Sequence, residues 1–528
     1  MAKDDEEVLY KPSTDETATK EQLRLSRRTF IIHIFFLTFL ISFLTCFCLI
    51  RLQLDTCNLG PEICEPNSPF TPEQLHLSLG ANDHEYYVTW STMEPADTYL
   101  IWNRASSKVL QVIKGEISEG HFDSDVEEGK KYQKYSYRAS MSVNLNTKYQ
   151  YRVVSCVNMK KGDIINSDNS EIEGICDGLL EKGEELITKA NYSSKQYEFL
   201  TKSFDDPNRT LNLIFYGDLG LLNAQSVPRL TKEVENNDLI IHNGDFAYDL
   251  NTKHGKYGDR FMRLMEPIAA RIPYQTTVGN HEIAANFSEY NHRFTMINRG
   301  AINHGAQNNF FYSFNAGPIH FVAFSTEFYY FLERVGLEPL VDQWNWLKED
   351  LRHATSEEER AKRPWIIVFG HRPMYCSSRD NDDCSKDSNI LRRGLPFVGG
   401  FALEKLFYDF GVDVEMYSHE HEYERFFPIY DGKFYNDSLA YQNAKAPAHI
   451  ISGSAGCQER LDPFNGDHVP GSARRISDYG YTRLVASRCK LEFQQVSDDQ
   501  NGTVVDQFVI SKNRQQNFPT LGPVLEGC

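Results

Sequence analysis

Residues able to bind metal ions gather in five short segments between residues 216 and 421 of this 528-residue chain. Each segment holds Asp, Asn, His or Tyr side chains, and all but the last contain glycine. They read Tyr216-Gly217-Asp218-Leu219-Gly220, Gly244-Asp245-Phe246-Ala247-Tyr248-Asp249, Gly279-Asn280-His281-Glu282, Val368-Phe369-Gly370-His371 and Ser418-His419-Glu420-His421. One such segment would mean little, because aspartates also cap helices and asparagines also occupy turns. Five in one chain predict a common site.

The donor atoms in these segments suit a pair of metal ions. Two carboxylates, one phenolate, one amide and three imidazoles are available, from Asp218, Asp245, Tyr248, Asn280, His371, His419 and His421. Oxygen donors combined with imidazole nitrogen, without thiolate, suit iron, manganese or zinc. Seven protein ligands are too many for one catalytic ion that must keep an open position. They suit two ions with a shared carboxylate, an arrangement that recurs in the hydrolysis of phosphate esters.

Short apolar runs precede most of these segments and predict the strands that position them. The runs are Leu211–Phe215, Leu239–Ile241, Trp365–Val368 and Val412–Met416. Such runs between turn residues are typical of buried strands, and an open α/β sheet places its ligands at strand ends. Helical patterns alternate with them, at Ala224–Asn236, Asp342–His353 and Ala402–Phe410. The pattern predicts a layered α/β domain over residues 208–512, followed by an irregular tail at 513–528.

The preceding region, residues 69–203, has the pattern of a β-sandwich. Short alternating segments such as Glu85–Trp90 and Tyr149–Val154 recur along it. Leu145–Tyr149 resembles the tyrosine corner of fibronectin type III domains. The region shows no cluster of catalytic residue types, so we expect a packing or spacer module.

Residues 29–50 form one apolar stretch of a length that can cross a bilayer. Arg24, Arg27 and Arg28 precede it and Arg51 alone follows, which favours a cytosolic N-terminus. We therefore predict a disordered cytosolic tail at 1–28, a transmembrane signal anchor at 29–50 and a linker at 51–68. The domains beyond it would be extracellular or luminal. The alternative is a secreted protein, released by cleavage of a signal peptide.

Eleven cysteines and five N-x-S/T sequons favour an oxidising, exported location. Near neighbours suggest the disulfides 57–64, 156–176 and 376–384, with 457–489 as a fourth, although spacing alone cannot fix connectivity. Cys528 would then be free or would link two chains in a dimer. The sequons lie at Asn191, Asn208, Asn286, Asn436 and Asn501. A net charge of −18 without a long Lys/Arg stripe argues against nucleic-acid binding.

The ordered set GDLG, GDFAYD, GNHE, VFGH and SHEHEYER resembles the purple acid phosphatases, within the calcineurin-like metallophosphoesterases. The resemblance covers roughly Pro69 to Lys512 and implies a four-layer α/β/β/α catalytic domain after a fibronectin III-like sandwich. It implies an Fe(III) ion bound by Asp218, Tyr248 and His421. A second, divalent ion (Zn, Fe or Mn) would be bound by Asn280, His371 and His419, with Asp245 bridging the two. His281 would contact the substrate phosphate.

Two features depart from the family pattern. Ser418 stands where the family has glycine, and no histidine occurs between His371 and His419, where plant members place substrate histidines. That stretch instead contains Cys376, Cys384 and the acidic segment 379–383. Leaving-group protonation and substrate preference therefore cannot be carried over from the family.

The expected function is that of a binuclear-metal acid phosphatase. It would hydrolyse phosphate monoesters by in-line attack of a metal-bound hydroxide, with His281 contacting the phosphate or protonating the leaving group. A phosphodiesterase or pyrophosphatase with the same metals is one alternative. A catalytically silent, membrane-tethered binding protein is the other.

Overall fold

The computed structural model describes residues 59–64, 68–118, 134–157, 187, 190–378, 383–464, 470–518 and 520–528. The predicted cytosolic tail, the predicted membrane segment and most of the predicted linker lie outside these ranges. None of the helices within them has the length and apolarity needed to cross a bilayer. The chain divides into two units, residues 1–64 and 65–528; the described part of the first contains the short helix α2 (Pro61–Cys64).

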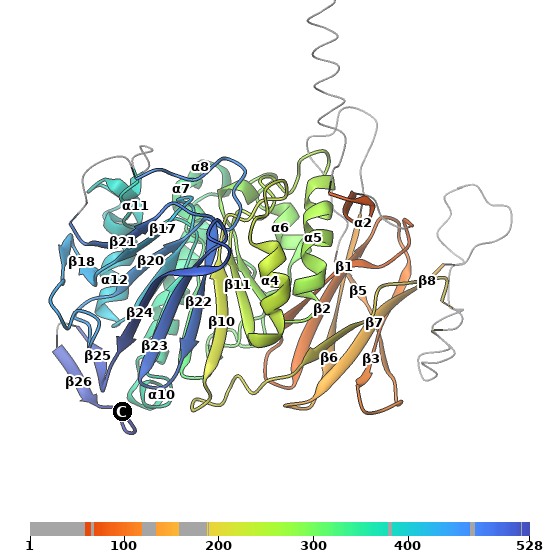
Figure 1. Cartoon of the computed structure of the whole chain (residues 1–528), viewed down its shortest axis with the longest axis horizontal. Coiled ribbons are helices and arrows are strands. Elements are labelled where there is room, and N and C mark those ends of the chain that lie inside the picture. Colours follow the sequence, from red (N-terminus) through yellow and green to blue (C-terminus); the bar gives the residue numbers. More distant parts are fainter. Residues whose placement is uncertain are drawn as a thin grey trace, which may run out of the picture. The chain divides into compact units, whose positions relative to one another are not determined.

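Two antiparallel sheets form the N-terminal part of the second unit (Figure 1). One has the strand order β1-β2-β6-β5, and the other has the order β4-β3-β7-β8 with β9 also paired to β7. Tyr86 of the first sheet packs against Phe199 of the second, with ring centroids 5.3 Å apart. The strands are β1 Glu73–Leu79, β2 Glu85–Thr92, β3 Asp97–Arg104, β4 Gln111–Lys114, β5 Glu116–Ser118, β6 Tyr135–Ser142, β7 Lys148–Cys156, β8 Tyr192–Ser193 and β9 Tyr197–Leu200.

The predicted tyrosine corner is present in this sandwich. The Tyr149 hydroxyl accepts a hydrogen bond from the Asn144 backbone N–H at 2.9 Å, which pins the chain at the start of β7. The region is thus a two-sheet β structure as expected, while its membership of the fibronectin type III class stays a prediction.

Two larger sheets make up the following domain. The 6-stranded sheet has the order β12-β11-β10-β22-β23-β24, and the 7-stranded sheet has the order β13-β14-β15-β16-β20-β17-β21. Phe215 of the first packs edge-on against Phe369 of the second, with centroids 6.3 Å apart. The strands of the first are β10 Leu211–Tyr216, β11 Leu239–Asn243, β12 Tyr274–Thr277, β22 Gly480–Ala486, β23 Lys490–Ser497 and β24 Thr503–Ser511. Those of the second are β13 Tyr312–Ala316, β14 Ile319–Ala323, β15 Trp365–Phe369, β16 Val414–Tyr417, β17 Tyr423–Phe426, β20 Ala448–Ser452 and β21 Ser472–Ile476.

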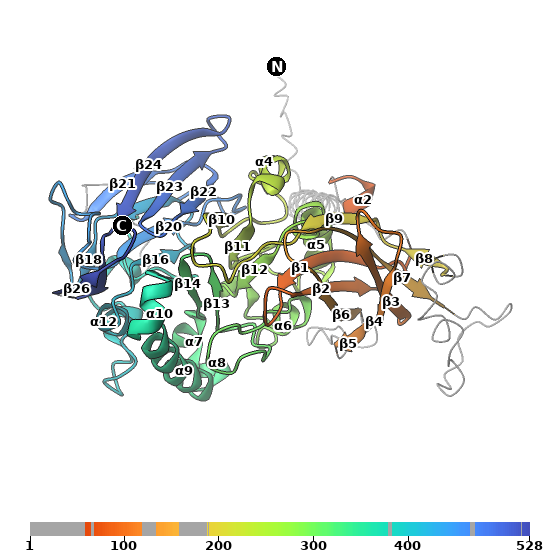
Figure 2. The same cartoon turned by 90° about the horizontal axis from the view of Figure 1, so that it is seen from below.

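Helices pack against the outer faces of both sheets, but β23 and β24 of the 6-stranded sheet have none over them (Figures 1 and 2). On the 6-stranded sheet, α5 packs through Phe261 against His242 of β11. The helix α4 reaches the same sheet through Glu233, which accepts hydrogen bonds from Tyr481 and Arg483 of β22. The helix α9 is joined to the 7-stranded sheet by its residue Gln343. The Gln343 side chain accepts from the Ser325 backbone N–H and donates to the Ser325 carbonyl, just after β14. The helices are α4 Val227–Glu233, η2 Val234–Asn236, α5 Lys256–Ala269, η3 Asn280–Glu282, α6 Ser288–Arg293, α7 Glu327–Tyr330, α8 Leu332–Val335, α9 Glu338–Ala354, α10 Glu357–Lys362, η4 Asp383–Ser385, α11 Ile390–Arg393 and α12 Leu403–Asp409.

Parallel strands at the centre of each sheet end at a common edge. β10 pairs in parallel with β11, and β11 with β12; in the other sheet β14, β15, β16 and β20 are parallel in succession. The two edges are joined by backbone bonds from Gly217 N–H to Ser452 C=O, at 3.0 Å, and from Ala455 N–H to Gly217 C=O, at 3.3 Å. The loops that follow these strands therefore converge on one place.

Buried charges join the sandwich to the α/β domain within the second unit. Lys134 lies between Asp259 at 3.1 Å and Glu289 at 2.8 Å, and Arg293 pairs with the same two carboxylates. The two cations balance two anions, so burial leaves no charge without a partner.

The C-terminal segment departs from the sequence prediction. Residues 513–528 were expected to be irregular, but β25 (Arg514–Asn517) pairs with β26 (Thr520–Val524) as a hairpin; a second small hairpin joins β18 (Ile429–Tyr430) to β19 (Lys433–Phe434). The predicted 457–489 disulfide is also wrong. Cys489 bonds Cys528, with Cα atoms 5.5 Å apart, because the hairpin returns the chain to the start of β23.

The remaining cysteine predictions have mixed outcomes. The predicted 376–384 disulfide is confirmed. Cys64 and Cys156 are each disulfide-bonded, and their predicted partners, Cys57 and Cys176, lie outside the described residues. Cys457 is free and buried. Since Cys528 is used within the chain, the predicted dimer through a Cys528 disulfide has no thiol to form it.

Peptide mapping of the unreduced protein tests this pairing. We expect a peptide pair joined through Cys489 and Cys528, and a Cys457 thiol that reacts with iodoacetamide only after unfolding. Cys528→Ser should lower the free energy of unfolding by about 2–4 kcal/mol, the usual effect of losing a disulfide of this kind. A Cys528-linked dimer on a non-reducing gel would contradict the structure.

Candidate metal centre

The seven predicted ligands come together in the loops at the common edge of the two sheets. Loops after β10, β11 and β12 provide four of them, Asp218, Asp245, Tyr248 and Asn280. Loops after β15 and β16 provide the three histidines, His371, His419 and His421. Each sheet thus contributes part of the set, and the predicted convergence is what the structure shows.

Three hydrogen-bond acceptors face one another in the first half of the cluster. His371 Nδ1–H donates to the Asn243 carbonyl at 2.8 Å, which leaves Nε2 with a lone pair in the neutral ring. That Nε2 lies 3.2 Å from Asp245 Oδ2 and 3.2 Å from Asn280 Oδ1. When the ring is protonated, Nε2–H can donate to Asp245; when it is neutral, the three lone pairs are placed to bind one metal ion.

A second group of donors lies on the other side of Asp245. Tyr248 Oη is 2.7 Å from His421 Nε2, and Asp218 Oδ1 is 3.5 Å from both atoms. His421 Nδ1–H donates to the Arg460 carbonyl at 3.0 Å, which again directs Nε2 into the cluster. Fixing the outer nitrogen of a histidine in this way is how proteins orient metal-binding imidazoles.

His419 completes the first group. One ligand atom each from Asp245, His371 and His419 lies within 4.8 Å of the other two. The His419 backbone N–H donates to Asp218 Oδ2 at 2.9 Å, which ties the loop after β16 to the loop after β10. Arg372 Nη1 lies 2.8 Å from His419 Nε2, while Arg372 Nε pairs with Glu327 at 3.1 Å.

The backbone at the ligands is strained. Asp218, Asp245, Tyr248 and His419 have φ values of +56°, +54°, +55° and +70°. Non-glycine residues rarely adopt this left-handed conformation, and each instance costs on the order of 1–3 kcal/mol. Four of them among seven candidate ligands indicate that the fold holds the loops in place for a purpose other than its own stability.

Two buried side chains cross-link the ligand loops. Asn243 donates to the Gly370 carbonyl at 2.7 Å and to Ser418 Oγ at 3.1 Å, and it accepts from Thr277 Oγ1 at 2.7 Å. Glu282 accepts from the backbone N–H groups of Asp245, Phe246 and Gly279 at 2.9, 3.1 and 2.8 Å.

Ser418, the residue that departs from the family pattern, is accommodated through its bond to Asn243. A Cβ at Gly217 would lie 2.4 Å from Ser418 Oγ, so the hydroxyl takes the space that this glycine leaves.

Electrostatics in the cluster favour cations. Burial lowers the pKa of His371, but Asp245 and Asp218 outweigh it and raise that pKa to about 10. Burial, with Asp218 and Asp245, raises the pKa of Tyr248 well above its ordinary value. A phenolate beside two carboxylates therefore requires added positive charge, such as a metal ion.

His281 lies at the pocket beside these ligands. Its ring is 4.6 Å from that of Tyr248, its Nδ1–H donates to Asp249 at 3.0 Å, and its backbone N–H donates to Asp245 at 3.0 Å. The pocket, of about 220 Å³, is lined by Asp245, Asn280, His281, His419, His421, Glu459 and Asp462. Sequence reasoning placed His281 at this position but missed Glu459 and Asp462, because no motif marks them.

Cys457 was also missed as a neighbour of the site. Its thiol donates to the Arg460 carbonyl at 3.2 Å, the same oxygen that orients His421. Burial raises the pKa of this thiol.

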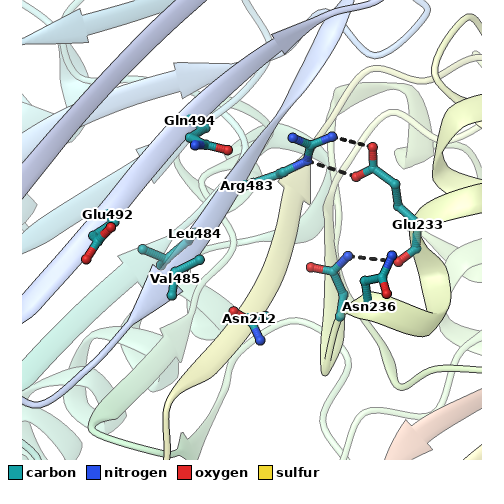
Figure 3. Close-up of a pocket in the computed structure, with 9 residues that line it drawn as sticks. Asn212, Glu233, Asn236, Arg483, Leu484, Val485, Glu492 and Gln494 are labelled. Atoms are coloured by element: carbon teal, nitrogen blue, oxygen red, sulfur yellow. Dashed lines mark hydrogen bonds and ion pairs between the residues drawn. The ribbon is translucent and has the colours of Figure 1, made fainter. Parts of the chain in front are cut away.

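A second hollow, of about 330 Å³, lies at the opposite end of β10 (Figure 3). Asn212, the second residue of that strand, lines it, whereas Asp218 follows the last. Arg483 also lines the hollow, and its guanidinium donates to both carboxylate oxygens of Glu233. The described lining residues of the hollow therefore include no unpaired cation and no group of three clustered metal-binding side chains.

A single added methyl group tests the geometry of the cluster. Gly279 has an ordinary φ of −111°, but a Cβ there would lie 2.1 Å from Asp245 Oδ1. Gly279→Ala should displace Asp245, lower bound metal measured by elemental analysis, and cost about 1–3 kcal/mol of stability through overpacking. Gly400→Ala is the matched control, because a Cβ there meets nothing within 4 Å. Full metal content in Gly279→Ala would contradict the assignment.

Comparison with known proteins agrees with this geometry. Residues 211–423 match the calcineurin-like phosphoesterase family model, and residues 446–507 match the iron/zinc purple acid phosphatase-like C-terminal model. Acid phosphatase type 7 of Danio rerio is 39% identical over 452 residues, covering 84% of this chain and 92% of the relative. The Homo sapiens protein of the same name is 37% identical over 469 residues, covering 88% and 95%.

A solved structure shares the fold. The purple acid phosphatase from yellow lupin seeds superposes with a TM-score of 0.64 at 20% identity, covering 84% of this chain and 75% of that one. The relatives cover both domains described above and not only the ligand loops. The chain therefore belongs to the purple acid phosphatases, within the calcineurin-like phosphoesterases.

Proposed function

We propose that the chain is an acid phosphatase that hydrolyses phosphate monoesters with two metal ions held at the described cluster. The observation on which this rests is the convergence of ligand atoms at His371, where Asp245 Oδ2 and Asn280 Oδ1 each lie 3.2 Å from the Nε2 atom. Family membership supports the phosphatase class. The complete ligand set argues against the catalytically silent alternative, because loss of function would leave such residues free to change.

The residues divide into two metal-binding groups that share one carboxylate. Asp218, Tyr248 and His421 would hold an Fe(III) ion, for which a phenolate is a suitable hard ligand. Asn280, His371 and His419 would hold a divalent Zn, Fe or Mn ion. Asp245 would bridge, since it lies beside His371 and its other oxygen is fixed by the His281 N–H. When bound, such a pair lowers the pKa of water and offsets charge on the phosphoryl oxygens.

His281 would hold the substrate phosphate. Its Nδ1–H is engaged by Asp249, so the second ring nitrogen, Nε2, faces the pocket. Burial lowers the pKa of His281, but Asp245 and Asp249 outweigh it and raise that pKa to about 9. Below that pH the ring is an imidazolium that can donate from Nε2 to a phosphoryl oxygen or to the leaving group; bound cations beside Asp245 would oppose this shift.

We also propose that the protein acts outside the cytosol, anchored by residues 29–50. The five sequon asparagines, Asn191, Asn208, Asn286, Asn436 and Asn501, are all exposed and thus open to glycosylation. The disulfides 376–384 and 489–528 fit an oxidising compartment. Secretion after cleavage of a signal peptide is the alternative.

Replacing the bridging carboxylate tests the shared ligand. Asp245→Asn keeps the shape of the side chain but loses the charge that two cations would share. We expect loss of both metals and a fall in para-nitrophenyl phosphate hydrolysis of more than about 100-fold, a loss that even a ligand-orienting residue can cause. Asp249→Asn, in the same loop, should keep both metals. Wild-type metal content in Asp245→Asn would refute the bridging role.

The visible spectrum tests the phenolate ligand. Tyr248→Phe removes only the hydroxyl, so the buried ring should keep its packing. We expect the iron-loaded wild type to absorb broadly near the green and the variant to lack that band. Iron-loaded wild type without such a band would exclude a Tyr248–Fe(III) bond.

A panel of monoesters, diesters and pyrophosphate across pH separates the proposed activity from the phosphodiesterase and pyrophosphatase alternatives.

A further inference from the structure

The part of the pocket not made by proposed metal ligands is acidic. Removing Asp245, Asn280, His419 and His421 from its lining leaves His281, Glu459 and Asp462. No lysine or arginine is among the described residues that line it. A leaving group that extends from a phosphate bound at the metals would therefore meet carboxylates.

Asp462 fixes the loop that brings these carboxylates to the site. Its carboxylate accepts from the His421 N–H at 2.6 Å, and its own N–H donates to the His421 carbonyl at 3.1 Å. This pair of bonds holds the segment after β20 against the ligand loop. The acidic lining is thus part of the folded site and not a chance approach of a surface loop.

Glu459 is the carboxylate best placed to meet a substrate. Glu459 Oε1 lies 3.7 Å from His281 Nε2, the nitrogen that faces the pocket. The side chain is 54% exposed, so it lies at the mouth of the pocket and contacts solvent as well. A second negative charge on a leaving group would approach it there.

The guanidinium near the ligands does not offset this charge. Arg372 reaches His419, but its Nε is paired with Glu327 at 3.1 Å and its guanidinium lies over the Tyr330 ring at 4.5 Å. It also does not line the pocket.

We infer that Glu459 is a specificity-determining residue, which selects phosphate monoesters with neutral or cationic leaving groups over substrates whose leaving group bears further negative charge. Pyrophosphate and nucleoside triphosphates belong to the disfavoured class. This inference rests on the proposed phosphatase function and gives it a substrate class. Because Glu459 is half-exposed, its effect is screened by water and salt, and discrimination of about three- to tenfold is expected from one such charge.

The experiment compares kcat/KM for three probes, which are phosphoethanolamine, para-nitrophenyl phosphate and pyrophosphate. Glu459→Gln keeps the size of the side chain and removes its charge. We expect the ratio of pyrophosphate to para-nitrophenyl phosphate to rise about three- to tenfold, and that of phosphoethanolamine to fall. High ionic strength should narrow the wild-type differences. Ratios of kcat/KM are used because they cancel any change that affects all three probes alike, such as a change in metal content.

Glu492→Gln is the matched control, since Glu492 is an exposed glutamate that lines the distant hollow of Figure 3. It should leave all three values unchanged, and metal content is measured for each protein. Unchanged ratios in Glu459→Gln, or a wild type that prefers pyrophosphate, would overturn the inference. If metal-loaded wild type hydrolyses no monoester at all, the proposed function fails instead.

Discussion

The constraint on which the structure depends is the convergence of metal-binding groups on Asp245. His371 Nδ1–H donates to the Asn243 carbonyl, which directs Nε2 toward Asp245 and Asn280, at 3.2 Å from each. The buried carboxylates Asp218 and Asp245 need positive charge beside them, and they raise the pKa of His371 accordingly. The loops after five strands are therefore shaped around positive charge at their centre.

The surrounding protein is organised to keep these groups in place. Four left-handed backbone positions lie at ligands, and Glu282 and Asn243 bind the loops that contain them. Aromatic contacts join the two sheets that hold these loops, and buried ion pairs join α5 to the sandwich. The sandwich, whose described residues form no metal-binding cluster, thus contributes by supporting α5.

Much of this could be predicted because each ligand loop follows a strand with a clear apolar pattern. The run Leu239–Ile241 predicted β11, and Asp245 and Tyr248 follow it as expected. The helix α5 was not predicted, since charged residues that pair with the sandwich, such as Asp259 and Arg263, are buried between its apolar residues, and Pro267 lies within it. The Cys489–Cys528 disulfide and the position of Glu459 depend on where distant segments return, which spacing does not reveal.

The division of ligands between two sheets has a consequence for biosynthesis. The first four ligands leave the ribosome well before the three histidines, and the Gly217–Ser452 bond that joins the two edges forms only when the chain has been made to β20. A chain that ends before His421 lacks part of the ligand set, so the complete site can assemble only after most of the α/β domain has been synthesised.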